Sequence, residues 1–431
     1  MRHLLALSFA LLPALALAQA PAPVPVPVPA PVDATDPVMA ETLPSEVPLA
    51  EIRRYVSVYN AVKDAYVEPV DDQQLMKSAL RGLLSDLDPH SAYLDKDEAE
   101  ALLDDTRGEY VGIGVETERR PDETLLVVSP IDGTPAHRAG LRAGDVIVAI
   151  NGEPLSGNAS PHHDLRGDVG EPVTITITRT GEIEPREMTI VREAIRVTSV
   201  TSRLLEPGYA YLRISTFQTD TGPQMRRQLR KLAEEAQDPM RGLVLDLRSN
   251  PGGLLSAAVE AADTLLDDGL IVRTQGRLQY SNASFHAKPG DLLEGAPVIV
   301  LVDTGTASAA EVLAGALRDH GRASVMGSRT YGKGSVQTVV PLDNGDSIKL
   351  TTARYYTPSG SSIQARGIRP DIVLRGEAAR GLREQDLAGH LAGEGEAKAK
   401  AGELIEGDSA ISRALEALKA GTATARARRR F

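Results

Sequence analysis

Residues 298–317 read VIVLVDTGTASAAEVLAGAL, an unbroken apolar run followed by a short turn and an alanine-rich segment. Consecutive Val, Ile and Leu residues are typical of a strand that is buried on both faces of a parallel sheet. From Ser308 onward, apolar residues recur at helical spacing, and Gly321 is the expected stop. A strand, a turn and a helix in this order predict one repeat of an α/β sheet.

The preceding residues show the same alternation. Strands are expected at Tyr209–Ile214 and Gly242–Leu247, and helices at Met225–Leu232 and Leu255–Leu266. The region from Gly208 to about Leu374 therefore predicts a partly parallel sheet with helices packed on it.

Two side chains in this region predict nucleophilic chemistry. Ser308 opens the expected helix, where the helix dipole and the amide of Ala309 would face a reacting group. Lys333 lies between two glycines, and a lysine becomes a base when burial lowers its pKa from the usual value of ~10.4. Taken singly, Ser308 or Thr306 is better explained as a helix N-cap, and a lysine beside glycines is usually a solvated surface residue.

A glycine pair, Gly252 and Gly253, follows the expected strand at 242–247. Glycines leave backbone amides open to a ligand, so an amide of this pair and the amide of Ala309 form a candidate oxyanion hole. A phosphate-binding loop is the alternative, but neither a GK[ST] nor a GxGxxG pattern accompanies the pair.

Gln337 is a further candidate for the same site. It follows Lys333 by four residues, which in an extended strand separates them by about 13 Å. A turn-like step, which Gly334 permits, would bring the two side chains together. Only in that geometry could the Gln337 amide orient the lysine.

Residues 107–196 show short strands and glycine turns, with a hairpin signal at Asn151-Gly152. This stretch resembles a PDZ domain of the bacterial type, and its Gly112-Ile113-Gly114-Val115 matches the carboxylate-binding loop. Successive amides at such a loop can hold the terminal carboxylate of a peptide that adds as a strand. A small β domain that uses its glycines only for turns is the alternative.

The N-terminal segments predict export. Residues 1–20 combine an early arginine, a short apolar run and a small-x-small ending, as in a cleaved signal peptide. An uncleaved membrane anchor is the alternative. Residues 21–48 are rich in proline and predict an extended linker, and residues 49–106 have the periodicity of a short helical module.

Composition excludes several other classes of protein. The net charge of −12 argues against broad binding to nucleic acid. The absence of cysteine excludes disulfides, a cysteine nucleophile and thiolate metal sites, and the absence of HExxH argues against a zinc peptidase. Beyond the signal, no stretch approaches the ~20 apolar residues of a spanning helix, so no stable membrane span is expected after cleavage.

Together the motifs resemble the carboxyl-terminal processing peptidases, also called tail-specific proteases, over roughly residues 50–376. Leu87-Asp88-Pro89-His90-Ser91 and Gly367-Ile368-Arg369-Pro370-Asp371 are further matches. The resemblance implies a multidomain α/β and α+β fold. Its expected parts are an N-terminal helical module (49–106), an inserted PDZ-like β domain (107–196), a crotonase-like α/β protease core (197–376) and a helical or disordered C-terminal tail (377–431).

The resemblance implies Ser308 as nucleophile, Lys333 as general base and Gln337 as the partner of the lysine. Ala309 and the pair Gly252 and Gly253 would supply the oxyanion amides. The implied function is a periplasmic or secreted serine endopeptidase that recognises substrate C-termini through the PDZ-like domain. Expected substrates are proteins or peptides with apolar C-termini. The resemblance implies no metal or cofactor for the enzyme. An adaptor protein and a homo-oligomer are compatible with this pattern.

Two other functions fit parts of the sequence. A catalytically inactive binding or adaptor protein would keep the PDZ-like loop but would not need both Ser308 and Lys333. A crotonase-like acyl-CoA enzyme would use a similar oxyanion hole, but it would need neither a PDZ-like insertion nor an export signal.

Overall fold

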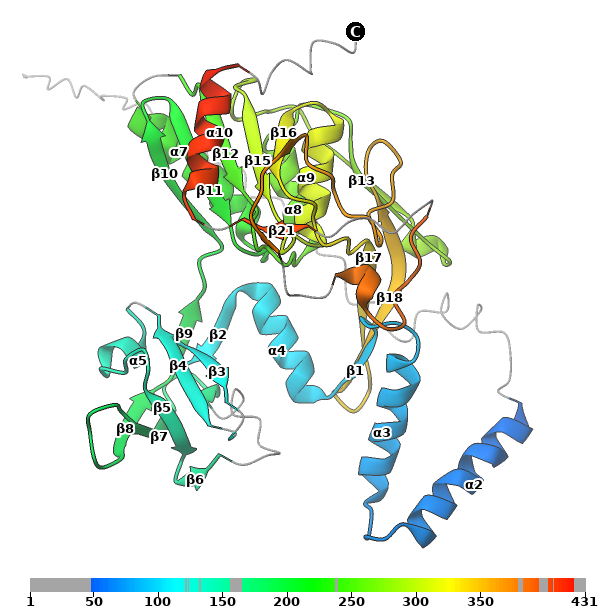
Figure 1. Ribbon diagram of the computed structural model, residues 1–431. Coiled ribbons are helices and arrows are strands. Elements are labelled where there is room, and N and C mark those ends of the chain that lie inside the picture. Colours follow the sequence, from blue (N-terminus) through cyan, green and yellow to red (C-terminus); the bar gives the residue numbers. More distant parts are fainter. Residues whose placement is uncertain are drawn as a thin grey trace, which may run out of the picture. The chain divides into compact units, whose positions relative to one another are not determined.

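The computed structural model describes residues 48–120, 122, 124–131, 133–155, 165–236, 239–378, 383–394, 402–405 and 407–421. The expected signal peptide, nearly all of the proline-rich linker and the arginine-rich end lie outside the described residues. The described residues fall into two compact units, with the boundary between Leu75 and Met76. Figure 1 labels the helices and strands of the chain. No helix of the described part is long and apolar enough to cross a lipid bilayer.

The expected helical module begins with α2 (Leu49–Ala65) and α3 (Asp72–Ser85). Asp72 accepts a hydrogen bond from the Tyr59 hydroxyl at 2.8 Å and forms an ion pair with Lys63. Further along the chain, α4 (Lys96–Arg107) starts with a capping box, in which Asp95 and Glu98 each accept the other's amide. The helix ends at Gly108, whose φ of 71° is the left-handed conformation of a common helix stop.

The PDZ-like region is built on a sheet with the strand order β3-β4-β5-β7-β8, and β6 pairs with β5. The strands β2 and β9 pair separately. Asn151 (φ 51°) and Gly152 (φ 82°) form the tight turn between β5 and β6, which confirms the predicted hairpin. The elements are β2 (Glu109–Gly112), β3 (Val115–Arg119), β4 (Leu125–Pro130), α5 (Pro135–Arg138), β5 (Val146–Ile150), β6 (Glu153–Pro154), β7 (Pro172–Thr178), β8 (Arg186–Val191) and β9 (Glu193–Arg196).

The expected partly parallel sheet is confirmed, with the strand order β10-β11-β12-β15-β16-β19. The pair β10–β11 is antiparallel and the other pairs are parallel. Every residue of β12, β15 and β16 is buried, which explains their continuous apolar sequences. The strands are β10 (Val200–Glu206), β11 (Tyr209–Ile214), β12 (Gly242–Asp246), β15 (Val298–Val302), β16 (Ala323–Gly327) and β19 (Ile372–Val373).

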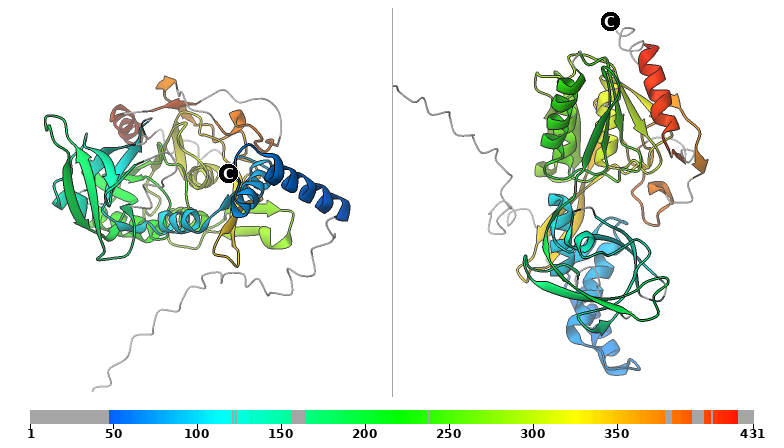
Figure 2. Two further views of the ribbon diagram at one scale, coloured as in Figure 1. Left: turned by 90° about the horizontal axis from the view of Figure 1, so that it is seen from below. Right: turned by 90° about the vertical axis from the view of Figure 1, so that its left-hand side faces the viewer.

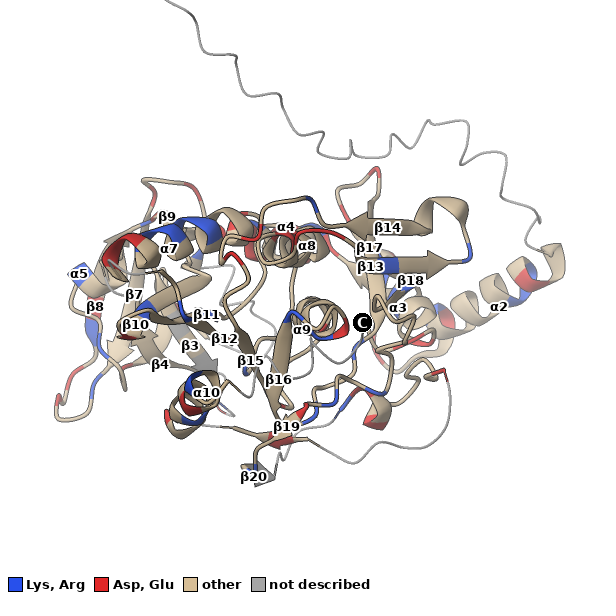
Figure 3. Ribbon diagram, turned by 90° about the horizontal axis from the view of Figure 1, so that it is seen from above, with Lys and Arg blue, Asp and Glu red and all other residues tan. Residues whose placement is uncertain are grey.

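Helices cover both faces of this sheet. The helices α7 (Thr221–Ala236), α8 (Leu255–Asp263) and α9 (Ala309–Asp319) share one apolar core with alternate residues of β12 and β15. The helix α10 (Ser409–Lys419) packs on the other face, and Figure 2 shows it opposite α7. In Figure 3 β15 and β16 are tan, while α7 and α10 carry charged residues. The helical part of the C-terminal tail is therefore a layer of the fold.

A second sheet of the same region is antiparallel, with the order β1-β18-β13-β14, and β17 pairs with β18. It positions the site because β17 begins two residues after Lys333. The elements are β1 (Ala92–Leu94), β13 (Leu270–Gly276), η1 (Gln279–Ser281), β14 (Ala283–His286), β17 (Ser335–Pro341) and β18 (Ser347–Tyr356). The C-terminal segment adds β20 (Glu377–Ala378), η2 (Glu384–Asp386) and β21 (Glu403–Leu404).

Candidate active site

Ser308 lies where the sequence places it, immediately before α9 and after the loop that follows β15. Its backbone has φ 53° and ψ −118°, a combination that costs energy for a residue with a side chain. Such strain is characteristic of functional positions because the surrounding structure must hold it. The residue is 8% exposed, so its hydroxyl lies in a largely enclosed environment.

Glu311 holds the Ser308 turn and the Lys333 loop together. Its side chain is fully buried. Its Oε2 atom accepts the amide of Ser308 at 2.8 Å and the amide of Lys333 at 2.9 Å. Its Oε1 atom accepts the amide of Gly332 at 2.8 Å and the hydroxyl of Thr330. One carboxyl group thereby fixes the backbone on both sides of the candidate site.

Glu311 was not among the residues predicted from the sequence, although the sequence contains a signal for it. Ser308-Ala309-Ala310-Glu311 has the [ST]-x-x-[DE] spacing of a capping box, which places Glu311 against the amide of Ser308. Burial raises the pKa of Glu311 to about 8, and its hydrogen bonds from Thr330, Ser308, Gly332 and Lys333 oppose that rise.

Lys333 is half-buried, unlike a solvated surface lysine. Burial is the main cause that lowers its pKa below the ordinary value, and the charge of Lys349 lowers it further. The flanking glycines allow close packing, because a Cβ atom on Gly334 would lie 2.3 Å from the amide nitrogen of Gln364. Burial and the charge of Lys349 both favour a neutral amine, the form that can accept a proton.

Tyr355, a buried residue of β18 that was not predicted from the sequence, interacts with the side chain of Ser308. Burial raises the pKa of Tyr355 to about 12, and a side-chain hydrogen bond with Ser308 partly opposes this rise. Among the described residues, no hydrogen bond joins the amine of Lys333 to the Ser308 hydroxyl. The structure therefore brings the two segments together through their backbones, by the amides of Ser308 and Lys333 on Glu311.

The glycine pair lies next to Ser308, as an oxyanion hole requires. Gly252 (φ 106°) and Gly253 (φ 128°) have backbone conformations that favour glycine. A Cβ atom on Gly252 would lie 2.8 Å from the Cβ of Ser308 and 3.1 Å from the amide nitrogen of Ala309. The Gly252 amide donates to Asn250 Oδ1 at 2.8 Å. Within the described chain, the amides of Gly253 and Ala309 have no protein acceptor, so both remain candidate oxyanion donors; Gly253 is exposed, whereas Ala309 is fully buried.

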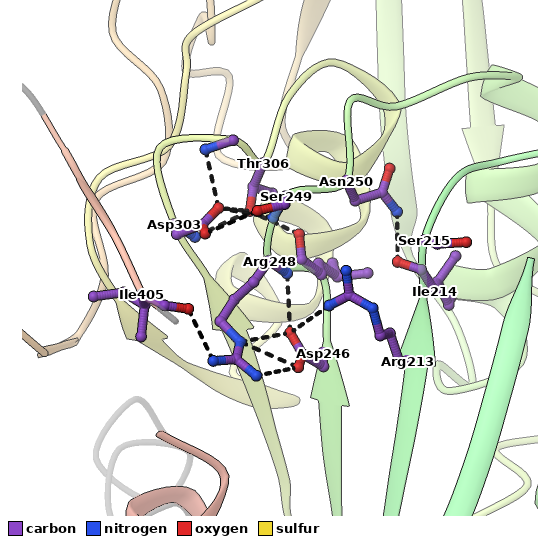
Figure 4. A network of polar contacts seen from close by, with 12 residues as sticks. Arg213, Ile214, Ser215, Asp246, Arg248, Ser249, Asn250, Asp303, Thr306 and Ile405 are labelled. Carbon is purple, nitrogen blue, oxygen red and sulfur yellow. Dashed lines mark hydrogen bonds and ion pairs between the residues drawn. The ribbon is translucent and has the colours of Figure 1, made fainter. Parts of the chain in front are cut away.

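Polar side chains fix the loop that carries this pair (Figure 4). Asn250 Nδ2 donates to the carbonyl of Ile214 at 2.9 Å, and the Asn250 carbonyl accepts the amide of Ala307 at 2.9 Å. The hydroxyl of Thr306 donates to the carbonyl of Leu247 at 2.8 Å. These bonds join the glycine loop to the turn before Ser308.

A buried ion pair extends the same network to the C-terminal segment (Figure 4). Arg248 contacts Asp246 through Nη2 at 2.6 Å, and Asp246 is fully buried. The other end of the guanidinium donates to the carbonyls of Ile405 at 2.9 Å and Gly407 at 3.0 Å. Residues of the C-terminal segment, more distant in the sequence than any strand of the sheet, thereby fix the start of the glycine loop.

Gln337 lies on β17, where a bulge separates it from Val336. Its amide donates to Ser335 Oγ at 3.0 Å and to Thr351 Oγ1 at 3.2 Å. In the described part of the chain no hydrogen bond joins it to Lys333. The extended strand, rather than a turn at Gly334, sets the direction of this side chain.

The loop matched to carboxylate binding runs from Gly112, the last residue of β2, to Val115, the first of β3. Ile113 is buried, and its carbonyl accepts the amide of Ala136 at 2.8 Å. Gly114 has φ 78°, and its carbonyl accepts the hydroxyl of Thr134 at 2.9 Å. The loop is thus held against the start of α5.

His320 is the histidine closest in sequence to Ser308, at the C-terminal end of α9. Its Nε2 atom lies 2.7 Å from the carbonyl of Leu270. This contact, at the opposite end of the helix from Ser308, argues against a Ser-His-Asp catalytic triad that would pair Ser308 with His320.

Three family models match successive parts of the chain. Residues 208–374 match Peptidase family S41, residues 126–179 match the PDZ domain, and residues 32–98 match the N-terminal domain of the activating protease CtpB. A "Carboxy-terminal-processing protease" of Bartonella bacilliformis is 43% identical over 356 residues, which cover 80% of this chain and 82% of that protein. The chain belongs to the carboxy-terminal-processing protease family.

Other members of this family are also similar. A "Probable CtpA-like serine protease" of Staphylococcus aureus is 36% identical over 335 residues, which cover 75% of this chain and 65% of that relative. The solved structure of a photosystem II D1 C-terminal processing protease is 32% identical, with a TM-score of 0.46, and the match covers 74% of this chain and 86% of that one. Membership of the carboxy-terminal-processing protease family confirms the expected fold class and identifies a serine-type peptidase with a PDZ domain.

Proposed function

We propose that the protein is an exported endopeptidase that uses Ser308 as nucleophile and Lys333 as general base, and that recognises the free C-terminus of its substrate through the PDZ domain. The observation that carries this proposal is the Glu311 carboxyl group, which accepts the amides of both Ser308 and Lys333. It is supported by the pKa of Lys333, which burial lowers.

In the proposed reaction, the Ser308 hydroxyl oxygen attacks the scissile carbonyl while the neutral amine of Lys333 takes the hydroxyl proton. The amides of Gly253 and Ala309 hold the resulting oxyanion, and Gly252 supports them through its contact with Asn250. The lysine ammonium then gives its proton to the leaving amine, which departs and leaves an acyl ester on Ser308. Lys333 deprotonates a water molecule that hydrolyses this ester and restores the serine.

Formation of the dyad requires a change in side-chain partners. The amine of Lys333 has to reach the Ser308 hydroxyl, which now lies beside Tyr355. Gln337 becomes the partner of the lysine only if its amide leaves Ser335 and Thr351. We assign Gln337 this orienting role in the active form.

Substrate recognition is assigned to Gly112-Ile113-Gly114-Val115, whose amides would receive the terminal carboxylate while the peptide adds as a strand. The proposed substrates are proteins or peptides with apolar C-termini. Export is supported by the signal-like residues 1–20, which would place the enzyme in the periplasm or outside the cell. An adaptor protein or a homo-oligomer is compatible with this reaction and is not required by it.

The decisive experiment measures cleavage of a fluorogenic peptide with a free apolar C-terminus. Ser308→Ala and Lys333→Ala are expected to abolish turnover, while the exposed controls Ser412→Ala and Lys231→Ala are expected to keep it. The amidated peptide should be cleaved more slowly by the wild type. Equal rates in all five proteins would refute the dyad, and binding of the peptide without any cleavage would support an inactive adaptor.

A further inference from the structure

Glu384 is a fully buried carboxyl group in the segment that follows the protease family match. It begins the short helix η2. Its Oε1 atom accepts a hydrogen bond from Gln364 Nε2 at 2.8 Å, and its Oε2 atom lies 2.7 Å from His90 Nε2. Burying a carboxyl group costs free energy unless hydrogen bonds compensate for it. A fully buried Glu384 is therefore a candidate for a specific role.

Gln364 connects this carboxyl group to the Lys333 loop. It is fully buried, and its Oε1 atom accepts the amide of Gly334 at 2.9 Å. Its Nε2 atom donates to the carbonyl of Leu391 at 3.0 Å as well as to Glu384. The residue after Lys333 is thus held by a side chain whose other end is fixed by the C-terminal segment.

Charged groups from several elements face Lys333. Lys349 on β18 lowers its pKa, whereas Glu384, Asp88 and Glu311 raise it. Asp88 is engaged with the amides of His90 and Ser91 and with the hydroxyl of Thr351. Glu384 itself is faced by His90 and Gln364, and its charge acts also on Tyr331.

A lysine that serves as a base needs an intermediate proton affinity. Burial favours the neutral amine, but an amine that loses its proton too readily is also a weak base. A carboxylate at the edge of the site opposes this effect. Glu384 would supply that charge, and the buried chain from Glu384 through Gln364 to Gly334 fixes it relative to the lysine loop.

We propose that Glu384 is a positioning residue for Lys333, through which residues 383–394 fix the lysine loop and set the pH at which its amine becomes a base. This role rests on the proposed function of Lys333. It extends the functional site beyond residue 374, where the match to the protease family ends.

The first test measures the protonation of Lys333 without catalysis. Competitive acetylation with acetic anhydride at a series of pH values, followed by mass spectrometry of the Lys333 peptide, gives the apparent pKa in a Ser308→Ala background. Glu384→Gln keeps the shape and removes the charge, so the apparent pKa of Lys333 should fall. Glu384→Ala also removes the charge, but it admits water to the space; because burial is the largest cause of the low pKa of Lys333, the restored hydration should outweigh the lost charge and raise the apparent pKa toward the ordinary ~10.4.

A matched control is Glu394→Gln, which removes an exposed carboxylate of the same segment that accepts the Tyr356 hydroxyl at 2.6 Å. It should leave the Lys333 pKa unchanged. General loosening of the structure would raise the pKa in both Glu384 variants, so the opposite shifts separate a charge effect from damage. An unchanged or higher value in Glu384→Gln would overturn the proposal.

If Glu384→Gln does not fold, Glu384→Asp decides in the same way, because the shorter carboxylate withdraws from Gln364. A lower Lys333 pKa in Glu384→Asp supports the role, and an unchanged or higher pKa rejects it.

The second test uses the pH profile of kcat/KM in proteins with intact Ser308. The acidic limb should move to lower pH in Glu384→Gln and to higher pH in Glu384→Ala. If Ser308→Ala and Lys333→Ala abolish cleavage but Glu384→Gln leaves both the limb and the labelling unchanged, only the role of Glu384 is refuted. If cleavage does not depend on Ser308 and Lys333, the proposed function is refuted and the labelling result still stands for the environment of Lys333.

Discussion

The main-chain amides of Ser308 and Lys333 share one hydrogen-bond acceptor, the Oε2 atom of Glu311, at 2.8 Å and 2.9 Å. This shared acceptor fixes the spacing between the strained turn of the serine and the loop of the lysine. Glu311 therefore constrains how far apart the proposed nucleophile and the proposed base can lie.

Glu311→Gln should lower both stability and activity. In either orientation, the new NH₂ group faces at least one backbone amide that now donates to the carboxyl group. Leaving buried donors unsatisfied costs about 1–3 kcal/mol. Urea unfolding and kcat/KM check this, with the exposed Glu234→Gln as control. Wild-type values of both quantities in Glu311→Gln would contradict the bridging role.

The same variant should change the pH dependence of stability. Burial raises the pKa of Glu311 to about 8, so the native state binds this proton more tightly than the unfolded chain. Its contribution is complete below the unfolded pKa of ~4.3 and is lost as pH rises through about 8. The stability of the wild type relative to Glu311→Gln should thus decrease over this range.

Lys349→Gln should shift the acidic limb of the kcat/KM profile to higher pH. The charge of Lys349 lowers the pKa of Lys333, so its removal raises that pKa and leaves less neutral amine at a given pH. Lys231→Gln, which removes an exposed lysine of α7, should leave the limb in place. A shift to lower pH in Lys349→Gln would show that another group controls the limb.

Gly252→Ala should impair catalysis more than it impairs folding. Its Cβ atom would press against the Cβ of Ser308 and the amide of Ala309, displacing the candidate oxyanion donors. Loss of one such donor typically lowers kcat by about 10²–10³. Gly295→Ala is the control because Gly295 also has positive φ (82°) but has open space at the Cβ position. Comparable activity in the two variants, measured at equal folded fraction, would argue against this location of the donors.

Arg248→Gln should release the C-terminal segment. The change breaks the buried ion pair with Asp246 and removes the donors to Ile405 and Gly407. Removal of one partner of a buried pair costs roughly 3–5 kcal/mol. Hydrogen exchange should accelerate in α10 and in the loop before Gly252. Arg375→Gln, which removes an exposed ion pair with Glu403, should show neither effect.

Gly114→Ala should weaken the use of substrates with free C-termini. Its Cβ atom would lie 2.3 Å from the Cβ of Thr134, and its φ of 78° is unfavourable for alanine. KM for a peptide with a free C-terminus should rise, while cleavage of the amidated peptide should change little. Gly140→Ala has a similar φ (83°) in open space and serves as control. Equal effects on both peptides would place carboxylate recognition elsewhere.

Much of the fold follows from local sequence patterns. Continuous apolar runs predicted β12 and β15, and the helical period after Ser308 predicted α9. The Asn151-Gly152 pair predicted a tight turn because both residues tolerate positive φ. In each case the deciding interactions lie within a few residues of one another.

The contacts that the sequence did not reveal join distant segments. The capping spacing places Glu311 near Ser308, but its bond to Lys333 depends on how β17 returns to the sheet. Tyr355 and Glu384 reach the site through strand pairing and through the C-terminal segment, which no local period encodes. The direction of the Gln337 amide depends on the neighbouring strand, where it finds Thr351.

Because Glu311 accepts the amides of both Ser308 and Lys333, the complete candidate site forms only after the later of these two segments has been synthesised and folded. A chain that has folded only as far as α9 can form the bond from the Ser308 amide to Glu311 but not the bond from the Lys333 amide. The turn is complete only when the later loop closes on the same oxygen. Under the proposed mechanism, a partly synthesised chain would carry the serine without the lysine loop, and it would gain hydrolytic activity only after that loop has folded.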